Sequence, residues 1–219
     1  MKAVIFDLDG VVVYTDAYHY QGWKRLADEE GWDFEESMND QLRGVSRMAS
    51  LQIILDYNGI ELPEDRKREL ADRKNEYYKE MLNGIDESAL VAGALDFIGK
   101  IRARGLRTGL GSSSRNARTV LDALEITPLF EVVVTGEDIT RSKPDPEIFL
   151  LGAQRLGLEP GECVVFEDAV SGVEAANAGG MISVGFGPTE GLEQAGADLL
   201  VPDYASLDVD AFVRGDLFR

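Results

Sequence analysis

The stretch VIFDLDGVVV, residues 4–13, decides the fold and frames the chemistry of this chain. It is apolar and strand-like, yet it contains two carboxylates, Asp7 and Asp9, one residue apart. Side chains alternate across a strand, so both carboxylates point the same way at the carboxyl end of a strand that we predict over residues 2–8, and Gly10 lets the chain turn there. Two carboxylates about 4 Å apart repel by roughly 4 kcal/mol at an effective dielectric near 20. This end of the strand therefore needs a cation, unless it is simply an acidic turn.

The chain from residue 86 onward alternates short β-rich runs with helical patterns, which is typical of parallel strands joined by crossover helices. The predicted strands are 106–111, 131–135, 163–166, 182–186 and 198–201. The predicted helices are 94–103, 116–124, 146–156 and 170–178. With the first strand, this part predicts a doubly wound α/β domain whose ligands bind beyond the carboxyl ends of the strands.

Residues 15–85 have a different sequence pattern. They lack strand runs and contain helical patterns interrupted by turn signals such as Gly31, Gly44 and Pro63. We therefore predict a Rossmann-like parallel-sheet core domain, formed by residues 1–14 and 86–219, with an inserted small α-helical cap domain of residues 15–85, called here the cap segment.

Composition limits the partners that this chain can have. Its 219 residues include 40 acidic and 22 basic side chains, a formal charge of −18 that repels nucleic acid and anionic membranes. The lone cysteine, Cys163, permits no internal disulfide and is expected to be buried filler. No apolar run approaches the roughly 18 residues of a membrane span, and no targeting segment is evident. We expect a cytoplasmic monomer that binds neither nucleic acid nor membranes.

Further polar residues follow or flank the later predicted strands. They are Ser112 to Arg115, Lys143 and Pro144, and Glu167 with Asp168. Carboxylates from separate strand ends suit Mg²⁺, which prefers few carboxylates together with waters and a phosphate. Hydroxyls and backbone N–H groups at the start of a helix suit a phosphate.

These residues form four ordered motifs: DLDG at 7–10, GSSS at 111–114, SKPDP at 142–146 and FED at 166–168. Their order and spacing resemble those of the haloacid dehalogenase superfamily of aspartyl-phosphate enzymes. A lone DxDG would be weak evidence, but four motifs at predicted strand ends are specific.

The resemblance implies a role for each core residue. Asp7 would be the nucleophile that forms an aspartyl phosphate, and Asp9 the general acid and base. Asp168, Asp7 and the Asp9 backbone carbonyl would hold one Mg²⁺, with Glu167 a secondary candidate. Ser112 would hydrogen-bond the transferring phosphoryl group and Lys143 would balance its charge.

The resemblance narrows to the β-phosphoglucomutase family over nearly the whole chain. It is carried by TDAYHYQGWKRLA at 15–27, RGVSR at 43–47, ADRKNEYYKEML at 71–82 and GSSSRNA at 111–117. It implies that His19 contacts the acid-base aspartate, that Arg47 clamps the non-reacting phosphate and that Lys74 contacts the sugar or contributes to specificity. The other expected substrate-site residues are Thr15, Trp23, Ser114, Arg115 and Asn116.

Plainer interpretations remain open for the cap residues. His19 could be a packed helix histidine, and Trp23 could belong to the cap core rather than stack on a sugar. Thr15 could cap a helix, and Arg47 and Lys74 could be solvated cations on exposed helix faces.

The chain departs from the family pattern at two positions. Relatives usually have Asp where this chain has Tyr14, with an Asp displaced to position 16, and Ala169 replaces a frequent Ser. The first departure lies at the core-to-cap crossing and bears on cap closure.

The sequence thus predicts a Mg²⁺-dependent phosphomutase that interconverts β-D-glucose 1-phosphate and glucose 6-phosphate through glucose 1,6-bisphosphate. The alternatives are a sugar-phosphate phosphatase of the same fold, in which water accepts the phosphoryl group, and a non-catalytic receiver-like binding domain.

Overall fold

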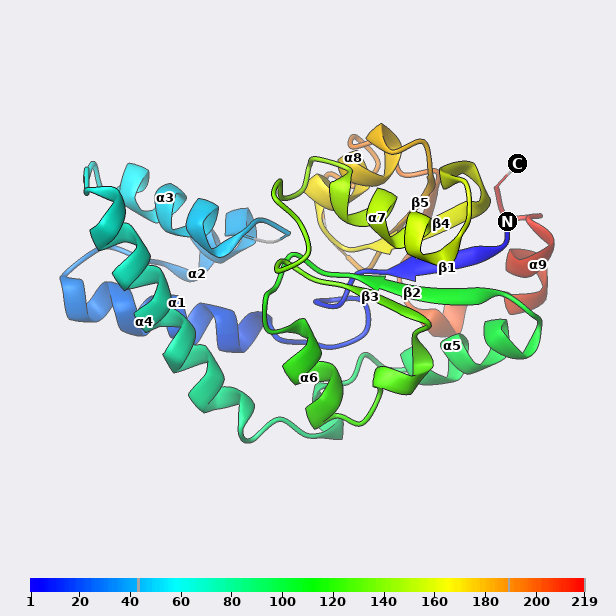
Figure 1. Cartoon of the computed structure of the whole chain (residues 1–219), viewed down its shortest axis with the longest axis horizontal. Helices are drawn as coiled ribbons and strands as arrows, with labels where there is room; N and C mark the ends of the chain where they lie inside the picture. Colours follow the sequence, from blue (N-terminus) through cyan, green and yellow to red (C-terminus); the bar gives the residue numbers. More distant parts are fainter. Residues whose placement is uncertain (43, 189, 219) are drawn as a thin grey trace.

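The computed structural model describes residues 1–42, 44–188 and 190–218. Figure 1 shows an α/β core at one end of the molecule and a group of helices at the other. The described strands form one parallel six-stranded sheet in the order β3–β2–β1–β4–β5–β6. Their bounds are β1 (Ala3–Phe6), β2 (Arg107–Gly111), β3 (Val132–Val134), β4 (Cys163–Glu167), β5 (Ile182–Phe186) and β6 (Leu199–Val201). The predicted fold class is confirmed.

Strand register brings the motif residues to one edge of the sheet. Phe6, at the end of β1, is level with Leu110 of β2 and Phe166 of β4. The residues that follow these three positions therefore emerge together at the carboxyl edge. Strand β1 is shorter than predicted, because Leu8 O accepts hydrogen bonds from Val12 N (2.9 Å) and Val13 N (3.0 Å), which folds the chain into a turn.

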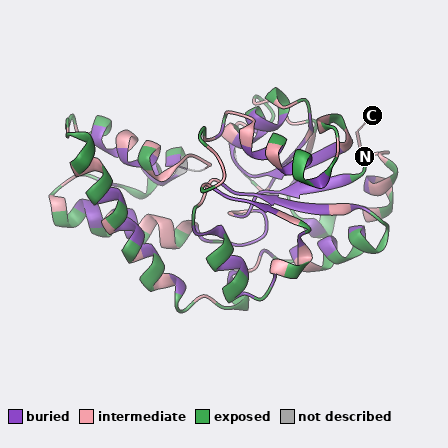
Figure 2. Ribbon diagram, in the orientation of Figure 1, coloured by how far each residue is buried: buried purple, intermediate pink, exposed green. Residues whose placement is uncertain are grey.

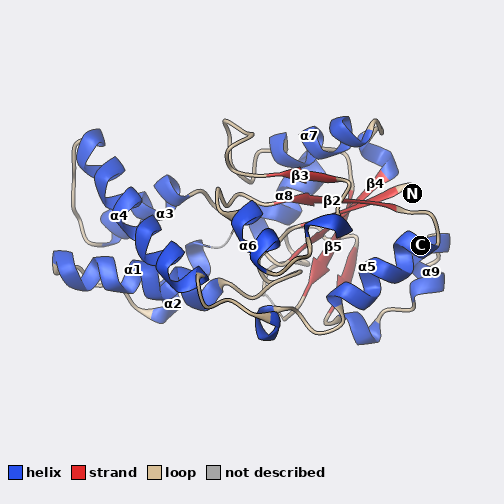
Figure 3. Cartoon of the chain, turned by 60° about the horizontal axis from the view of Figure 1, so that its bottom comes forward, coloured by secondary structure: helices blue, strands red, loops and turns tan. Residues whose placement is uncertain are grey.

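Helices cover both faces of the sheet (Figures 1 and 3). They are α5 (Ala94–Ala103), α6 (Ala117–Ala123), α7 (Glu147–Leu156), α8 (Val170–Ala178) and α9 (Val209–Arg214). Val4 and Phe6 pack in the same hydrophobic cluster as the buried side chains of α5, α6 and α9, whereas Ala3 and Ile5 pack with those of α7 and α8. The alternation of side chains along β1 thus supplies both halves of the core. The sequence pattern missed α9, which has only 6 residues.

One aromatic group fixes the loop after β1. The rings of Phe97 and Phe166 both pack against the Tyr204 ring, with centroids 5.1 and 6.1 Å from it. The buried Tyr204 hydroxyl donates to Val11 O at 3.0 Å, which ties the loop to the C-terminal part of the core. Cys163 is buried in β4, as predicted.

The cap segment contains α1 (Asp16–Glu30), α2 (Glu36–Asn39), α3 (Arg47–Tyr57) and α4 (Glu64–Leu82). These helices bury a cluster of their own that includes Trp23, Leu51 and Leu70, and Figure 2 shows their buried faces turned toward one another. Short 3₁₀ helices complete the described structure: η1 (Asp40–Leu42), η2 (Glu87–Ala89), η3 (Thr127–Leu129), η4 (Pro160–Glu162) and η5 (Tyr204–Ser206). None of the described helices combines the length and apolar character needed to cross a bilayer.

Candidate active site

A cavity of about 560 Å³ lies between the carboxyl edge of the sheet and the cap segment. Core residues in its lining include Asp7, Asp9, Ser114, Arg115, Asn116 and Asp168, and cap residues include His19, Trp23, Arg47 and Lys74. Most of the residues singled out from the sequence are therefore brought to one place.

A buried ion network lies at the end of β1. Lys143 Nζ donates to Asp7 Oδ1 and to Glu167 Oε1, and all three residues are buried. Burial alone would lower the pKa of Lys143, but the two carboxylates raise it above its ordinary value. Lys143 is therefore a permanent cation against Asp7, and it offsets part of the carboxylate repulsion expected from the sequence.

Asp9 has a different environment. Its Oδ1 atom is buried without a hydrogen-bond partner among the described residues. Burial, together with the negative charge of Asp7, raises the pKa of Asp9 well above its usual range. The two carboxylates of the DLDG motif thus differ, with Asp7 held by a lysine and Asp9 favouring its protonated form.

Gly10 lets the loop after β1 lie directly against Asp168. Its φ is +73°, and a Cβ atom there would lie 2.1 Å from Asp168 Oδ2. Any side chain would therefore be strained and would collide with Asp168. This close approach keeps the Asp7–Asp9 turn beside the carboxylate that follows β4.

The edge fits a magnesium ion. In the described part of the chain no group of three or more His, Cys, Asp and Glu side chains is arranged around a common metal position. Mg²⁺ does not require one, because it binds through one or two carboxylates plus waters and substrate phosphate. Asp7 and Asp168, which line the same cavity, would hold it together with the Asp9 backbone carbonyl.

The geometry gives Glu167 a supporting position. Its Oε1 accepts from Lys143, and its Oε2 accepts from Ala169 N at 2.9 Å. Both oxygens are engaged within the protein, which favours a role in holding Lys143 over direct ligation of a metal. Ala169 is buried, so the methyl group that stands in place of the frequent Ser hydroxyl faces protein.

The loop after β2 is held by its own hydroxyl groups. Ser112 is buried, and its Oγ accepts from Ser114 N at 3.2 Å, while Ser114 Oγ accepts from Asn116 N at 3.2 Å. Ser113 Oγ donates to Gly44 O of the cap segment at 3.0 Å. The same loop thus presents polar groups to the cavity and contacts the cap.

On the cap side, the partly buried His19 pairs with the buried Lys74. His19 Nδ1 lies 2.9 Å from Lys74 Nζ, and the His19 ring stacks on Tyr78 with centroids 4.2 Å apart. Burial, reinforced by Arg47, lowers the pKa of Lys74 to about 7. Burial, together with the charges of Lys74 and Arg47, lowers the pKa of His19 well below its ordinary value. The interpretation of Lys74 as a solvated helix-face cation is wrong.

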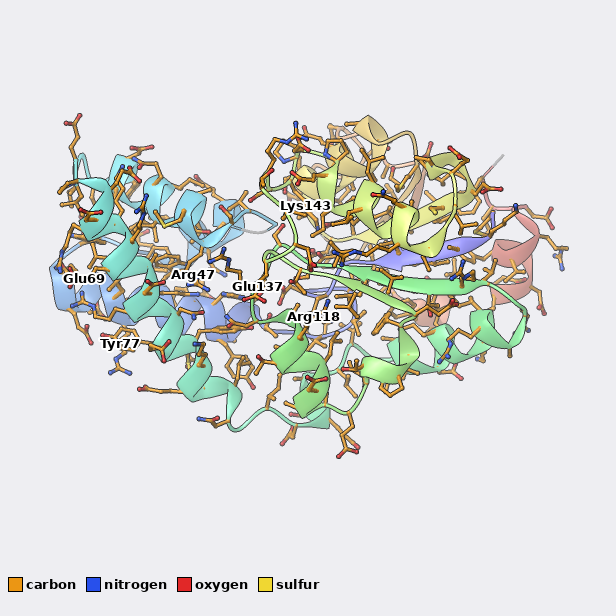
Figure 4. The ribbon with its side chains drawn as sticks, viewed as in Figure 1. Arg47, Glu69, Tyr77, Arg118, Glu137 and Lys143 are labelled. Carbon is orange, nitrogen blue, oxygen red and sulfur yellow. The ribbon has the colours of Figure 1, made fainter. Side chains whose placement is uncertain are left out.

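Arg47 begins α3 and points toward the core (Figure 4). Its Nη1 lies 3.4 Å from Asp72 Oδ1, and 20% of its side chain is exposed. Burial lowers the pKa of Arg47; Asp72 opposes this shift and Arg115 of the core adds to it. Guanidinium groups of the cap, including Arg47, and of the core, Arg115, therefore line one cavity, which suits an anion. Arg43, the first residue of the RGVSR motif, lies outside the described residues.

Thr15 and Trp23 contribute to packing. Thr15 is buried and is the N-cap residue of α1, as one interpretation expected, although its side chain makes no capping hydrogen bond within the described structure. Trp23 belongs to the cap cluster and also lines the cavity, with Lys74 Nζ 4.9 Å from its ring centroid. Tyr14 is 56% exposed at the core-to-cap crossing.

Asp16 and Asn75 are among the residues of the cavity lining that sequence reasoning missed. Asp16 was noted only as a displaced acid. Asn75 follows Lys74 directly and lies inside a quoted motif, so its position in the sequence was the available signal. Its contact with the core depends on tertiary structure.

These features define an α/β enzyme with acidic residues and a paired lysine at the carboxyl edge of a parallel sheet, beneath a helical cap. Residues 1–180 match the family model described as haloacid dehalogenase-like hydrolase. The chain belongs to this family of enzymes.

The relatives include both mutases and phosphatases. The chain is 38% identical over 212 residues to a β-phosphoglucomutase of Bacillus subtilis, covering 96% of this chain and 93% of the relative. It is 34% identical over 184 residues to a phosphorylated carbohydrates phosphatase of Thermotoga maritima, covering 83% and 82%. The crystal structure of β-phosphoglucomutase from Clostridium difficile superposes with a TM-score of 0.92 at 34% identity, covering 100% of both chains.

Proposed function

We propose that this enzyme is a Mg²⁺-dependent phosphomutase that interconverts β-D-glucose 1-phosphate and glucose 6-phosphate. The observation that carries the proposal is the cavity, which is lined by Asp7 and also by Arg47 and Arg115. A phosphatase needs one phosphate site, whereas a mutase that uses a bisphosphate must hold two phosphates in one enclosure. The mutases among its relatives support the same choice.

In this proposal, Asp7 attacks phosphorus and forms the aspartyl phosphate, while the leaving oxygen takes the proton of Asp9. Asp9 then removes a proton from the sugar hydroxyl that accepts the phosphoryl group. Lys143 and Ser112 stabilise the charge on the transferring oxygens. Bound Mg²⁺ would add electrostatic stabilisation of the phosphoryl oxygens.

The cap residues determine which acceptor reaches the aspartyl phosphate. Arg47, with Ser114 and Arg115 opposite, holds the phosphate that does not react, so glucose 1,6-bisphosphate can bind in either direction. Lys74 contacts the sugar, and His19 contacts Asp9 and couples the placement of Asp9 to substrate binding. The cap segment acts as a domain that closes over the core and excludes water.

A sugar-phosphate phosphatase is the second candidate. Two observations favour it: phosphatases are also among the relatives, and Tyr14 replaces the usual acid where the chain enters the cap. Membership of an enzyme family disfavours the receiver-like alternative.

The test is ³¹P NMR of the protein with Mg²⁺, β-D-glucose 1-phosphate and a trace of glucose 1,6-bisphosphate. A mutase converts the substrate signal into that of glucose 6-phosphate, and the reaction depends on the trace of bisphosphate. Inorganic phosphate as the main product would overturn the proposal in favour of the phosphatase.

A further inference from the structure

Two hydrogen bonds connect the cap segment to the loop after β2. Ser113 Oγ donates to Gly44 O at 3.0 Å, and Asn116 Nδ2 donates to Asn75 Oδ1 at 2.7 Å. The Gly44 contact is tight, since a Cβ atom there would lie 2.5 Å from Ser171 Oγ. The described structure is therefore one in which the cap touches the core.

The Asn75–Asn116 bond joins the cap to the core through two buried side chains, with 8% and 7% of their surfaces exposed. When the cap opens, both amides gain water, so little hydrogen bonding is lost. When it closes, each amide loses water and depends on the other. Such a pair penalises every closed arrangement except the one that aligns both side chains.

The position of this pair links closure to the phosphate sites. Asn75 follows Lys74 on α4, and Asn116 starts the helix after the loop that contains Ser112 and Ser114. Asn116 N donates to Ser114 Oγ, and Ser114 N donates to Ser112 Oγ. Three hydrogen bonds, joined through Asn116 and Ser114, therefore link the cap helix to the Ser112 hydroxyl, which is proposed to bind the transferring phosphoryl group.

We propose that Asn75 is a positioning residue that latches the closed cap through Asn116 and thereby decides whether the aspartyl phosphate meets a sugar or water. This inference rests on the proposed function. Asn75 does not act on the phosphoryl group itself. It sets the closed-to-open ratio of the cap, and that ratio sets the share of phosphoryl groups lost by hydrolysis.

The latch can be tested by comparing Asn75→Ala and the nearly isosteric Asn75→Leu with Gln52→Ala. The control removes a carboxamide from α3 that donates to Asp56 on the same helix. Cap closure is measured with spin labels at the exposed positions Glu69 and Lys100, over a series of glucose 6-phosphate concentrations. Cys163 is buried, so introduced cysteines can be labelled selectively. Hydrolysis is measured as inorganic phosphate released per glucose 6-phosphate formed.

Loss of one buried hydrogen bond is expected to lower the closed-to-open ratio about tenfold in both Asn75 variants and to raise the phosphate share by a similar factor. Gln52→Ala should match the parent on both readouts. Unchanged label distances in both Asn75 variants would overturn the latch. Label distances and a phosphate share equal to those of the parent in Asn75→Leu would show that Asn75 acts only through packing. The distances decide this even if the parent protein proves to be a phosphatase, because they do not depend on the acceptor.

Discussion

Two buried lysines, one in each part of the molecule, have opposite environments. Lys143 of the core lies between the carboxylates of Asp7 and Glu167, and its pKa is raised. Lys74 of the cap lies against His19 and two aromatic rings, and its pKa falls to about 7. The core has thus paired its cation within the protein, whereas the cap holds cationic groups whose natural partner is an anionic ligand. This difference agrees with the proposed roles of the two parts, in which the core transfers the phosphoryl group and the cap selects its acceptor.

The largest effect is expected from Asp7→Asn. The substitution keeps the shape of the side chain but removes the nucleophilic carboxylate, so turnover should fall by at least about 10⁴-fold while the fold is retained. The measurement is kcat for glucose 6-phosphate formation together with circular dichroism. Asp96→Asn, an exposed residue on α5, is the matched control. Substantial turnover by Asp7→Asn would remove the covalent mechanism.

Lys143→Met should destabilise the protein strongly. It leaves Asp7 and Glu167 buried without their shared cation, which costs roughly 3–5 kcal/mol when one partner of a buried ion pair is removed. Urea unfolding at pH 7 measures the change. A loss below about 1 kcal/mol would show that the core network does not depend on its lysine.

Arg47→Ala should separate the two proposed phosphate sites. Loss of a guanidinium clamp is expected to lower kcat/KM for the bisphosphate-dependent reaction about 100-fold, with hydrolysis of p-nitrophenyl phosphate changed only a few-fold. Arg25→Ala, an exposed arginine on α1, serves as the control. Equal losses on both substrates would contradict a role confined to the distal phosphate.

Lys74→Met should stabilise the protein, whereas Lys143→Met is expected to destabilise it. The pKa of Lys74 is about 7 in the folded protein, below its ordinary value of 10.5, so the unfolded chain binds more protons between these limits. The contribution of Lys74 to the free energy of unfolding therefore rises with pH across that window. Below pH 7 the destabilisation caused by its buried charge is fully present. The groups that face it are His19, Arg47, Asp9 and Tyr78.

The matching measurement is urea unfolding of the parent and of Lys74→Met at pH 6.5, 8 and 9.5. The variant should be the more stable protein at pH 6.5, by about 1–3 kcal/mol, and the advantage should shrink as the pH rises. A difference that is constant with pH would show that Lys74 does not titrate in this window.

The core was predictable from the sequence, for physical reasons. Parallel strands place their carboxyl ends at one edge, so Asp7, Ser112 and Asp168 could be brought together from motif order alone. The pairing of Glu167 with Lys143 was not foreseen, because a carboxylate beside Asp168 is equally suited to a metal. Which oxygens it uses depends on the backbone N–H of Ala169.

The cap was less predictable. Helical periodicity places Lys74 on a charged helix, but its burial depends on how α1 and α4 pack, and the Asn75–Asn116 contact depends on how the cap meets the core. Neither is encoded in local spacing. Family resemblance pointed to His19, Arg47 and Lys74, while the contacts among them came from the structure.

The central claim is that the closed cap directs the phosphoryl group of Asp7 to a sugar hydroxyl instead of water. The most direct test is to run the reaction of β-D-glucose 1-phosphate, with Mg²⁺ and a trace of the bisphosphate, in water enriched in ¹⁸O and to analyse the products by mass spectrometry. The account predicts glucose 6-phosphate without ¹⁸O in its phosphate group and little inorganic phosphate. Inorganic phosphate that has gained ¹⁸O as the main product would contradict it.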